Sequence, residues 1–248
     1  MTLSLDMILL AGLVFGCAGL IHGSMGFGFP MVATPLLALV TDIQTAILIT
    51  LVPTVYINAA SIASEGDVLK ALKTHYSFAL LAMAGSAVGT QILIMTGSEA
   101  FKLVLAFAIL VYLAINVIPL RLPAIRHYPK VSKIGFGLLA GFVGGLTNVM
   151  APVLIIYTLE LNRSKTETIQ SANICFLFGK TIQLILFAAD GQVTLPIVSL
   201  SFWNLIATSM ALYAGLCVRK KIHGPLYQKL LKGLLLILAA LLVGQTLL

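Results

Sequence analysis

The chain has little charge and lacks the motifs of the common enzyme classes. Only 9% of its 248 residues are charged, eight of them acidic, whereas 60% are hydrophobic. A water-soluble domain of this length could not cover its surface with so few polar side chains. The sequence also lacks a Gly-x-Ser-x-Gly element, an intramembrane acid pair, a His-rich metal cluster and a nucleotide-binding loop. These absences argue against an enzyme, against direct drive by ATP and against a cofactor.

Cysteine is equally scarce. Cys17, Cys175 and Cys217 are odd in number and have no metal-like spacing. All three fall in apolar runs, so we expect them to be buried and to behave as small hydrophobic side chains.

Apolar runs long enough to cross a bilayer recur along the whole chain. A membrane helix needs about 20 such residues, and lipid offers backbone groups no other partner, so these runs must be helical. The ten-residue alternating segments of a membrane barrel are absent. We therefore expect an all-α, multi-pass protein of a cell (inner) membrane. Its six full spans are predicted at residues 43–62, 76–95, 101–120, 168–189, 195–218 and 226–248.

Two further regions each hold two apolar pieces that are too short to cross alone. The first runs over 7–21 and 30–40 with a break at 22–29, and the second over 134–146 and 152–159 with a break at 147–151. Pro30 and Pro152 end the two breaks and suit the first position of a new helix. Each region is predicted to be a re-entrant or broken pair of half-helices.

The two halves of the chain resemble each other. A shift of 125 positions superposes Gly12, Gly16 and Gly19 on Gly137, Gly141 and Gly144, and a slightly different shift superposes the two prolines. We predict two repeats, 1–124 and 125–248, each a broken pair plus three transmembrane helices, which together form one transmembrane domain. Chance coincidence of abundant glycine and alanine is the alternative.

Loop charges indicate how the repeats are oriented. If each broken pair turns back, thirteen of the fifteen Lys and Arg fall on one side, with Lys102 opposite and Lys180 inside a span. The positive-inside rule then places both termini outside and makes the repeats inverted. The same rule explains the net charge of +7 without nucleic acid.

The breaks combine features that favour an anion. Exposed N–H groups at two helix starts carry partial positive charge, and Gly26 and Gly28 allow a ligand to approach the backbone. His22, Ser24, Thr147 and Asn148 add side-chain donors. Helix packing and satisfaction of freed carbonyls are their alternative roles.

Lys180 places an ammonium deep in a span with no acid within a turn or two. A central lysine costs about 3 kcal/mol on insertion scales, so a bound anion is its expected partner. Asn173 and Gln183 lie on about the same helix face. Snorkelling to an interface is the alternative.

The glycine and proline pattern carries a family resemblance. The first copy comprises Ala11, Gly12, Gly16, Gly19, Gly23, Gly26, Gly28 and Pro30; the second spans 141–152 and is followed by Tyr157 and Lys165. This pattern, over essentially the whole chain, resembles the sulfite exporter TauE/SafE family. The resemblance implies outward transport of sulfite, sulfonates and related sulfur-containing anions. Residues 147–150 depart from the glycine-rich pattern with larger side chains.

Together these features predict a secondary transporter that exports a small sulfur-containing anion by alternating access. An anion channel, or a transporter of another small anion such as a carboxylate, is the alternative. The expected partners are the anion and the bilayer, and a homodimer is left open.

Overall fold

The computed structural model describes residues 5–97, 99–115, 117–118, 122–219 and 225–247. These residues form eleven helices. Their bounds are α1 (Leu5–Met25), α2 (Phe29–Ala38), α3 (Ile43–Ser64), α4 (Val68–Thr96), α5 (Phe101–Ile115), α6 (Ala124–His127), α7 (Pro129–Thr147), α8 (Ala151–Glu160), α9 (Lys165–Ala189), α10 (Leu195–Arg219) and α11 (Pro225–Leu247).

Five of the helices are long and apolar enough to cross a membrane, namely α1, α3, α4, α9 and α10. The all-helical, multi-pass prediction is therefore confirmed. Several bounds differ: α4 begins eight residues before the predicted span at 76, because Asp67 caps its first turn by accepting the Lys70 N–H. Helix α1 has 21 residues, about 31 Å, and is not the half-length piece that we expected. The predicted end of the third span at 120 lies outside the described residues.

Both helix breaks are shorter than predicted. The first comprises Gly26–Gly28 because α1 continues through His22, and the second comprises Asn148–Met150. Each following helix starts one residue before its proline, so Pro30 and Pro152 are second residues.

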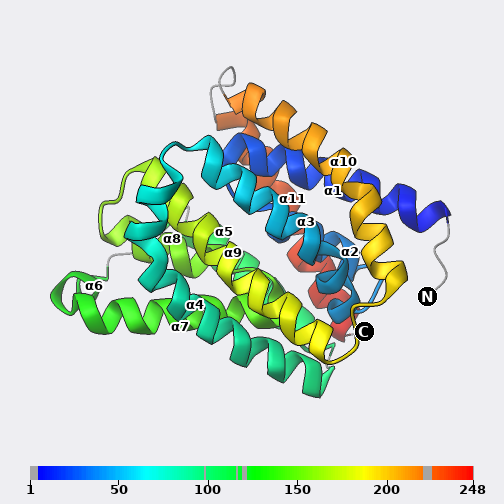
Figure 1. Ribbon diagram of the computed structural model, residues 1–248, viewed down its shortest axis with the longest axis horizontal. Coiled ribbons are helices and arrows are strands. Elements are labelled where there is room, and N and C mark those ends of the chain that lie inside the picture. Colours follow the sequence, from blue (N-terminus) through cyan, green and yellow to red (C-terminus); the bar gives the residue numbers. More distant parts are fainter. Residues whose placement is uncertain (1–4, 98, 116, 119–121, 220–224, 248) are drawn as a thin grey trace.

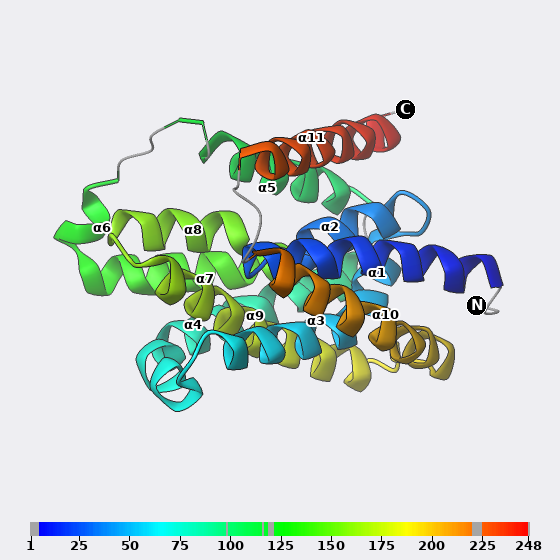
Figure 2. The same ribbon diagram turned by 90° about the horizontal axis from the view of Figure 1, so that it is seen from above.

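Each broken pair turns back on itself, with α2 returning toward the start of α1 and α8 toward the start of α7 (Figures 1 and 2). Polar contacts join neighbouring helix ends at each of the two ends of the molecule. At one end Arg126 contacts Glu160 and Arg219 contacts Glu65; at the other the Gln245 amide donates to the Leu39 carbonyl. Both chain termini lie at the second end (Figures 1 and 2).

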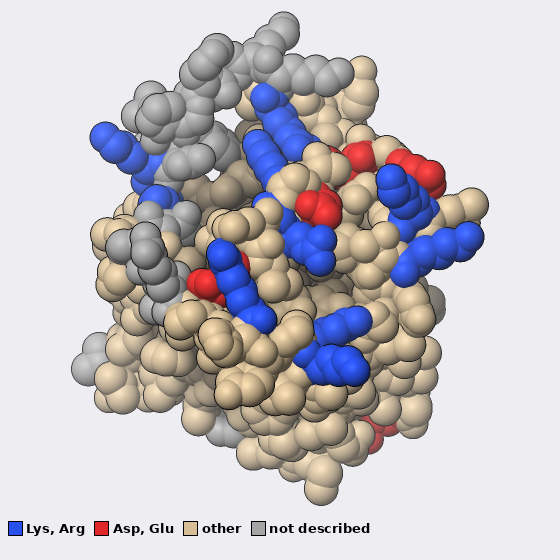
Figure 3. Space-filling model, turned by 90° about the vertical axis from the view of Figure 1, so that its left-hand side faces the viewer, with Lys and Arg blue, Asp and Glu red and all other residues tan. Residues whose placement is uncertain are grey.

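Basic side chains gather at the end that carries α6 (Figure 3). This end holds the turn between α3 and α4 and the turn between α8 and α9, with Lys70, Lys73 and Arg163. Of the basic residues assigned to this side, Arg121, Lys220 and Lys221 lie outside the described residues. We call this end the basic end.

Two helix pairs, α4 with α7 and α1 with α10, pack with their backbones in contact. A Cβ atom at Gly141 would lie 1.8 Å from the Ala82 carbonyl oxygen, and one at Gly23 would lie 2.3 Å from that of Leu212. Small residues at such crossings allow membrane helices to approach closely. Of the repeat glycines, Gly19 and Gly141 lie at such crossings, whereas Gly16 has no neighbour within 4 Å of an added Cβ atom.

The three cysteines are unpaired. Cys175 is buried as predicted, but Cys17 and Cys217 are exposed, because they lie on faces of α1 and α10 that no other described helix covers.

Candidate functional site

The first break owes its shape to two glycines. Gly26 has a φ of 93° and Gly28 a φ of 107°, values that side-chain-bearing residues rarely adopt. A Cβ atom at Gly26 would also lie 2.7 Å from the Ile169 side chain on α9. The chain can therefore reverse direction here while touching α9 closely.

His22 closes this break from inside α1. Its buried ring accepts the Phe29 N–H at Nδ1, over 3.3 Å, so it satisfies an open donor at the start of α2. The hydrogen must then sit on Nε2, which donates to the Ser61 hydroxyl on α3 over 2.8 Å. This network assigns His22 as a neutral ring that ties the break to α3.

Asn173 holds the same break from α9. Its side-chain N–H₂ group donates to the Gly26 and Ile169 carbonyls, over 2.7 and 2.8 Å. Within the described residues its buried Oδ1 has no hydrogen-bond partner. Ser24 is half-buried and donates to the Ile21 carbonyl of its own helix.

The second break uses an asparagine in place of glycine. Asn148 has a φ of 68° and donates to the hydroxyls of Thr34 on α2 and Thr50 on α3, each over 2.7 Å. Asparagine tolerates this backbone better than other non-glycine residues. Thr147 donates to the Val143 carbonyl and accepts the Val149 N–H. The break is thus tied to α2 and α3 by Asn148, and one of its backbone donors, the Val149 N–H, is satisfied by Thr147.

Lys180 belongs to α9, and its ammonium lies against the end of α7, just before this break. It is fully buried and donates to the Gly144 carbonyl over 2.9 Å and to the Gln183 side-chain oxygen over 2.6 Å. Gln183 in turn donates to the Gly145 carbonyl over 2.9 Å. The last carbonyls of a helix lack partners and carry partial negative charge, so they favour a cation.

The predicted site residues thus form two groups, one at each break. His22, Gly26 and Asn173 share contacts at the first, and Lys180, Gln183 and the Thr147–Asn148 turn surround the second. Gly28 precedes α2, and Ser24 contacts its own helix. At the start of α2, the Phe29 N–H binds His22; in the second break, the Val149 N–H binds Thr147.

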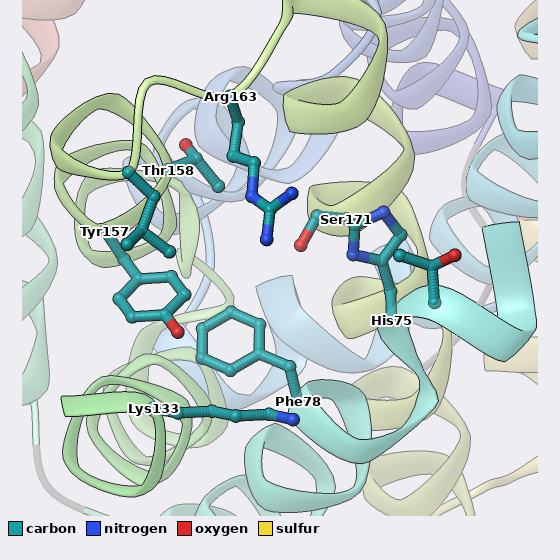
Figure 4. Close-up of a pocket in the computed structure, with 9 residues that line it drawn as sticks. His75, Phe78, Lys133, Tyr157, Thr158, Arg163 and Ser171 are labelled. Carbon is teal, nitrogen blue, oxygen red and sulfur yellow. The ribbon is translucent and has the colours of Figure 1, made fainter. Parts of the chain in front are cut away.

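Sequence reasoning missed a cavity of about 110 Å³ between α4, α7, α8 and α9 (Figure 4). Basic side chains and hydroxyls line it, together with Phe78 and Leu161. The polar lining consists of Thr74, His75, Lys133, Tyr157, Thr158, Arg163 and Ser171. These residues come from four helices and one turn, so no short sequence motif joins them. Tyr157 was noted only as part of the family pattern.

Aromatic rings form one wall of this cavity. Phe78 and Tyr157 stack with their centroids 4.6 Å apart, and Phe136 packs on Tyr157 at 5.6 Å. In the part of the chain described, no three His, Cys, Asp or Glu side chains gather in a way that could hold a metal ion. The basic side chains of Lys133 and Arg163 in the lining favour an anion.

Comparison with known proteins agrees with this chemistry. Residues 9–242 match the family model described as Sulfite exporter TauE/SafE. No curated protein and no solved structure matches the chain.

Proposed function

Since the chain belongs to the sulfite exporter TauE/SafE family, whose members are membrane transporters and not enzymes, we propose that it exports a small sulfur-containing anion by alternating access. Sulfite or a small sulfonate is the substrate class. The single observation that carries the proposal is that α9 binds both helix breaks. It does so through Asn173 at the first and Lys180 at the turn before the second.

These two contacts support a shared region between the breaks. Asn173 and Lys180 are seven residues apart on α9, about 10 Å along the helix axis. Helix α3 repeats the arrangement, since Ser61 binds His22 at the first break and Thr50 binds Asn148 at the second. Broken helices that meet in the interior are where transporters bind substrate.

Lys180 supplies the charge for an anion. Its ammonium has three N–H donors, and two of them bind acceptors on Gly144 and Gln183. In the described residues no carboxylate forms an ion pair with it. A buried cation without a counter-ion is costly, so an anion that approached the third donor would be stabilised.

Inverted repeats, 1–124 and 125–248, provide the alternating access. The pairing of α1 with α10 and of α4 with α7 supports this, because the first helix of each broken pair packs against a helix of the other half. Helices α4 and α10 hold equivalent places in the two halves when the four-residue helix α6 is left out. Closing one pair against its partner while the other opens would expose the centre to one side at a time. One chain supplies both breaks, so the proposal does not require a homodimer.

The basic end faces the cytoplasm in this proposal, with both termini outside. The gathering of Lys and Arg at one end supports this orientation. A Lys130→Cys variant without native cysteines should react with an impermeant maleimide only after the membrane is opened. Labelling in intact cells would show that the basic end faces outward, opposite to this proposal.

The experiment that tests the function is sulfite efflux from proteoliposomes that contain the purified protein. Wild type should show saturable efflux, and Lys180→Met should abolish saturation because the charge is lost while the length is kept. Lys130→Met, which removes an exposed lysine on α7, is the matched control and should behave as wild type. Non-saturating flux in the wild type would indicate a channel, and unchanged efflux by Lys180→Met would refute the role of the lysine.

A further inference from the structure

We infer that the cavity between α4, α7, α8 and α9 is a second anion site, where the transported oxyanion is captured at the basic end before it reaches the breaks. We call it the capture site. The inference rests on the proposed function, because it names a further site for the same substrate.

The charge of the lining is the first support. His75, Lys133 and Arg163 contribute nitrogen atoms, and no carboxylate lines the cavity. Lys133 donates one N–H to the Ser77 hydroxyl over 2.5 Å, which leaves two N–H groups that can bind a ligand. Arg163 pairs through Nη1 with Glu167 at 3.1 Å, and its guanidinium has four other N–H groups.

The arrangement of the side chains is the second support. The Arg163 guanidinium, the Ser171 hydroxyl and the His75 ring point toward one another (Figure 4). They come from the α8–α9 turn, α9 and α4. An oxyanion with three oxygens on one sulfur can accept from several directions at once, which suits such a convergent set of donors.

Size restricts the ligand. The cavity has a volume of about 110 Å³, which suits a compact ligand. Sulfite has four heavy atoms, and the head group of a sulfonate is equally small. The stacked rings of Phe78 and Tyr157 fix one wall, so the cavity does not depend on flexible side chains alone.

Position links the cavity to transport. Helices α7 and α8, the second broken pair, form one side of it, and Ser171 is two residues before Asn173 on α9. On the outer side it adjoins a larger cavity of about 390 Å³ that shares Thr74 and His75. Lys70 lines this larger cavity together with two carboxylates, Asp67 and Glu167. Movement of the broken pair against α4 would therefore open a path from the capture site toward the breaks.

The test measures transport from each side of oriented proteoliposomes, with sulfite offered at a range of concentrations. Lys133→Met and Arg163→Gln should each raise the KM at the basic end about tenfold, the effect of losing one charge-assisted hydrogen bond. Vmax, and the KM at the opposite end, should stay within about twofold. Lys130→Met, one helical turn before Lys133 and exposed, is the control and should leave both KM values unchanged.

The outcomes separate this inference from the proposed function. Absence of saturable sulfite transport by the wild type defeats the proposed function itself. Saturable wild-type transport, with both variants matching Lys130→Met in KM at the basic end, defeats only the capture site. Two variants on different elements guard against loss of folding, which gel filtration of each purified protein monitors.

Discussion

The two helix breaks are each three residues long but differ in backbone conformation and in chemistry. The first reverses the chain with Gly26 and Gly28 and is held by neutral side chains, His22 and Asn173. The second uses Asn148 and lies beside a buried cation, Lys180. Two helix breaks in one chain therefore do not need the same charged side chain beside them.

The difference suggests a division of roles between the breaks. At the first, both ring nitrogens of His22 have partners, so the ring serves as a structural link and has no free site for a proton. The second break offers a cation with an N–H to spare. An anion should therefore depend on the second break for its charge and on the first for the shape of the space around it.

Glycine-to-valine substitutions should have the largest effect, and they test whether the two broken pairs pack alike. A Cβ atom at Gly23 would meet the Leu212 carbonyl at 2.3 Å, and one at Gly145 would meet the Ser86 carbonyl at 2.5 Å. Backbone cannot move aside, so each valine should cost about 3 kcal/mol or more. Thermal unfolding of the purified variants measures this loss.

Gly16→Val and Gly135→Val are matched controls on the same helices. Neither position has an atom within 4 Å of an added Cβ. Both controls should unfold within a few degrees of the wild type. If Gly145→Val were as stable as Gly135→Val, the close crossing of α4 and α7 would be wrong.

Two substitutions of Asn148 should have intermediate effects and separate its backbone role from its side-chain role. Glycine accepts the φ of 68° but loses the bonds to Thr34 and Thr50, at a cost of about 2 kcal/mol. Alanine loses the same bonds and adds strain, for about 3 kcal/mol in total. Unfolding temperatures should therefore fall in the order wild type, Asn148→Gly, Asn148→Ala. Equal stability of the two variants would show that the backbone strain at residue 148 contributes nothing to the free energy of unfolding.

Much of this architecture is readable from sequence because lipid imposes it. Long apolar runs must be helices in a bilayer, and breaks within them require glycine, proline or a small polar residue. The break positions and the polar residues near them follow from these rules. The length of each break could not be predicted from these rules. His22 is helical in α1 although its sequence neighbours Gly23 and Ser24 favour a break.

The partners of the polar residues could not be predicted in the same way. The absence of a nearby acid suggested an anion as the partner of Lys180, yet the structure supplies the Gly144 carbonyl oxygen of α7 and the side-chain oxygen of Gln183. The capture site was missed for a related reason. Lys133, His75 and Arg163 each look like an ordinary basic loop or interface residue, and only tertiary packing brings them together.

Anion selectivity should show the smallest effect and the sharpest difference between the breaks. Three oxygens on one sulfur can accept from Lys180 and from neighbouring donors together, whereas a carboxylate offers two. Sulfoacetate should therefore compete with sulfite for the wild type about fivefold better than malonate, a difference of about 1 kcal/mol.

His22→Asn should keep that ratio, because the first break contributes no charge. Lys180→Met should bring it close to one. Competition isotherms on the purified proteins measure both ratios; a ratio that His22→Asn changes as much as Lys180→Met would contradict the assignment of the charge to the second break.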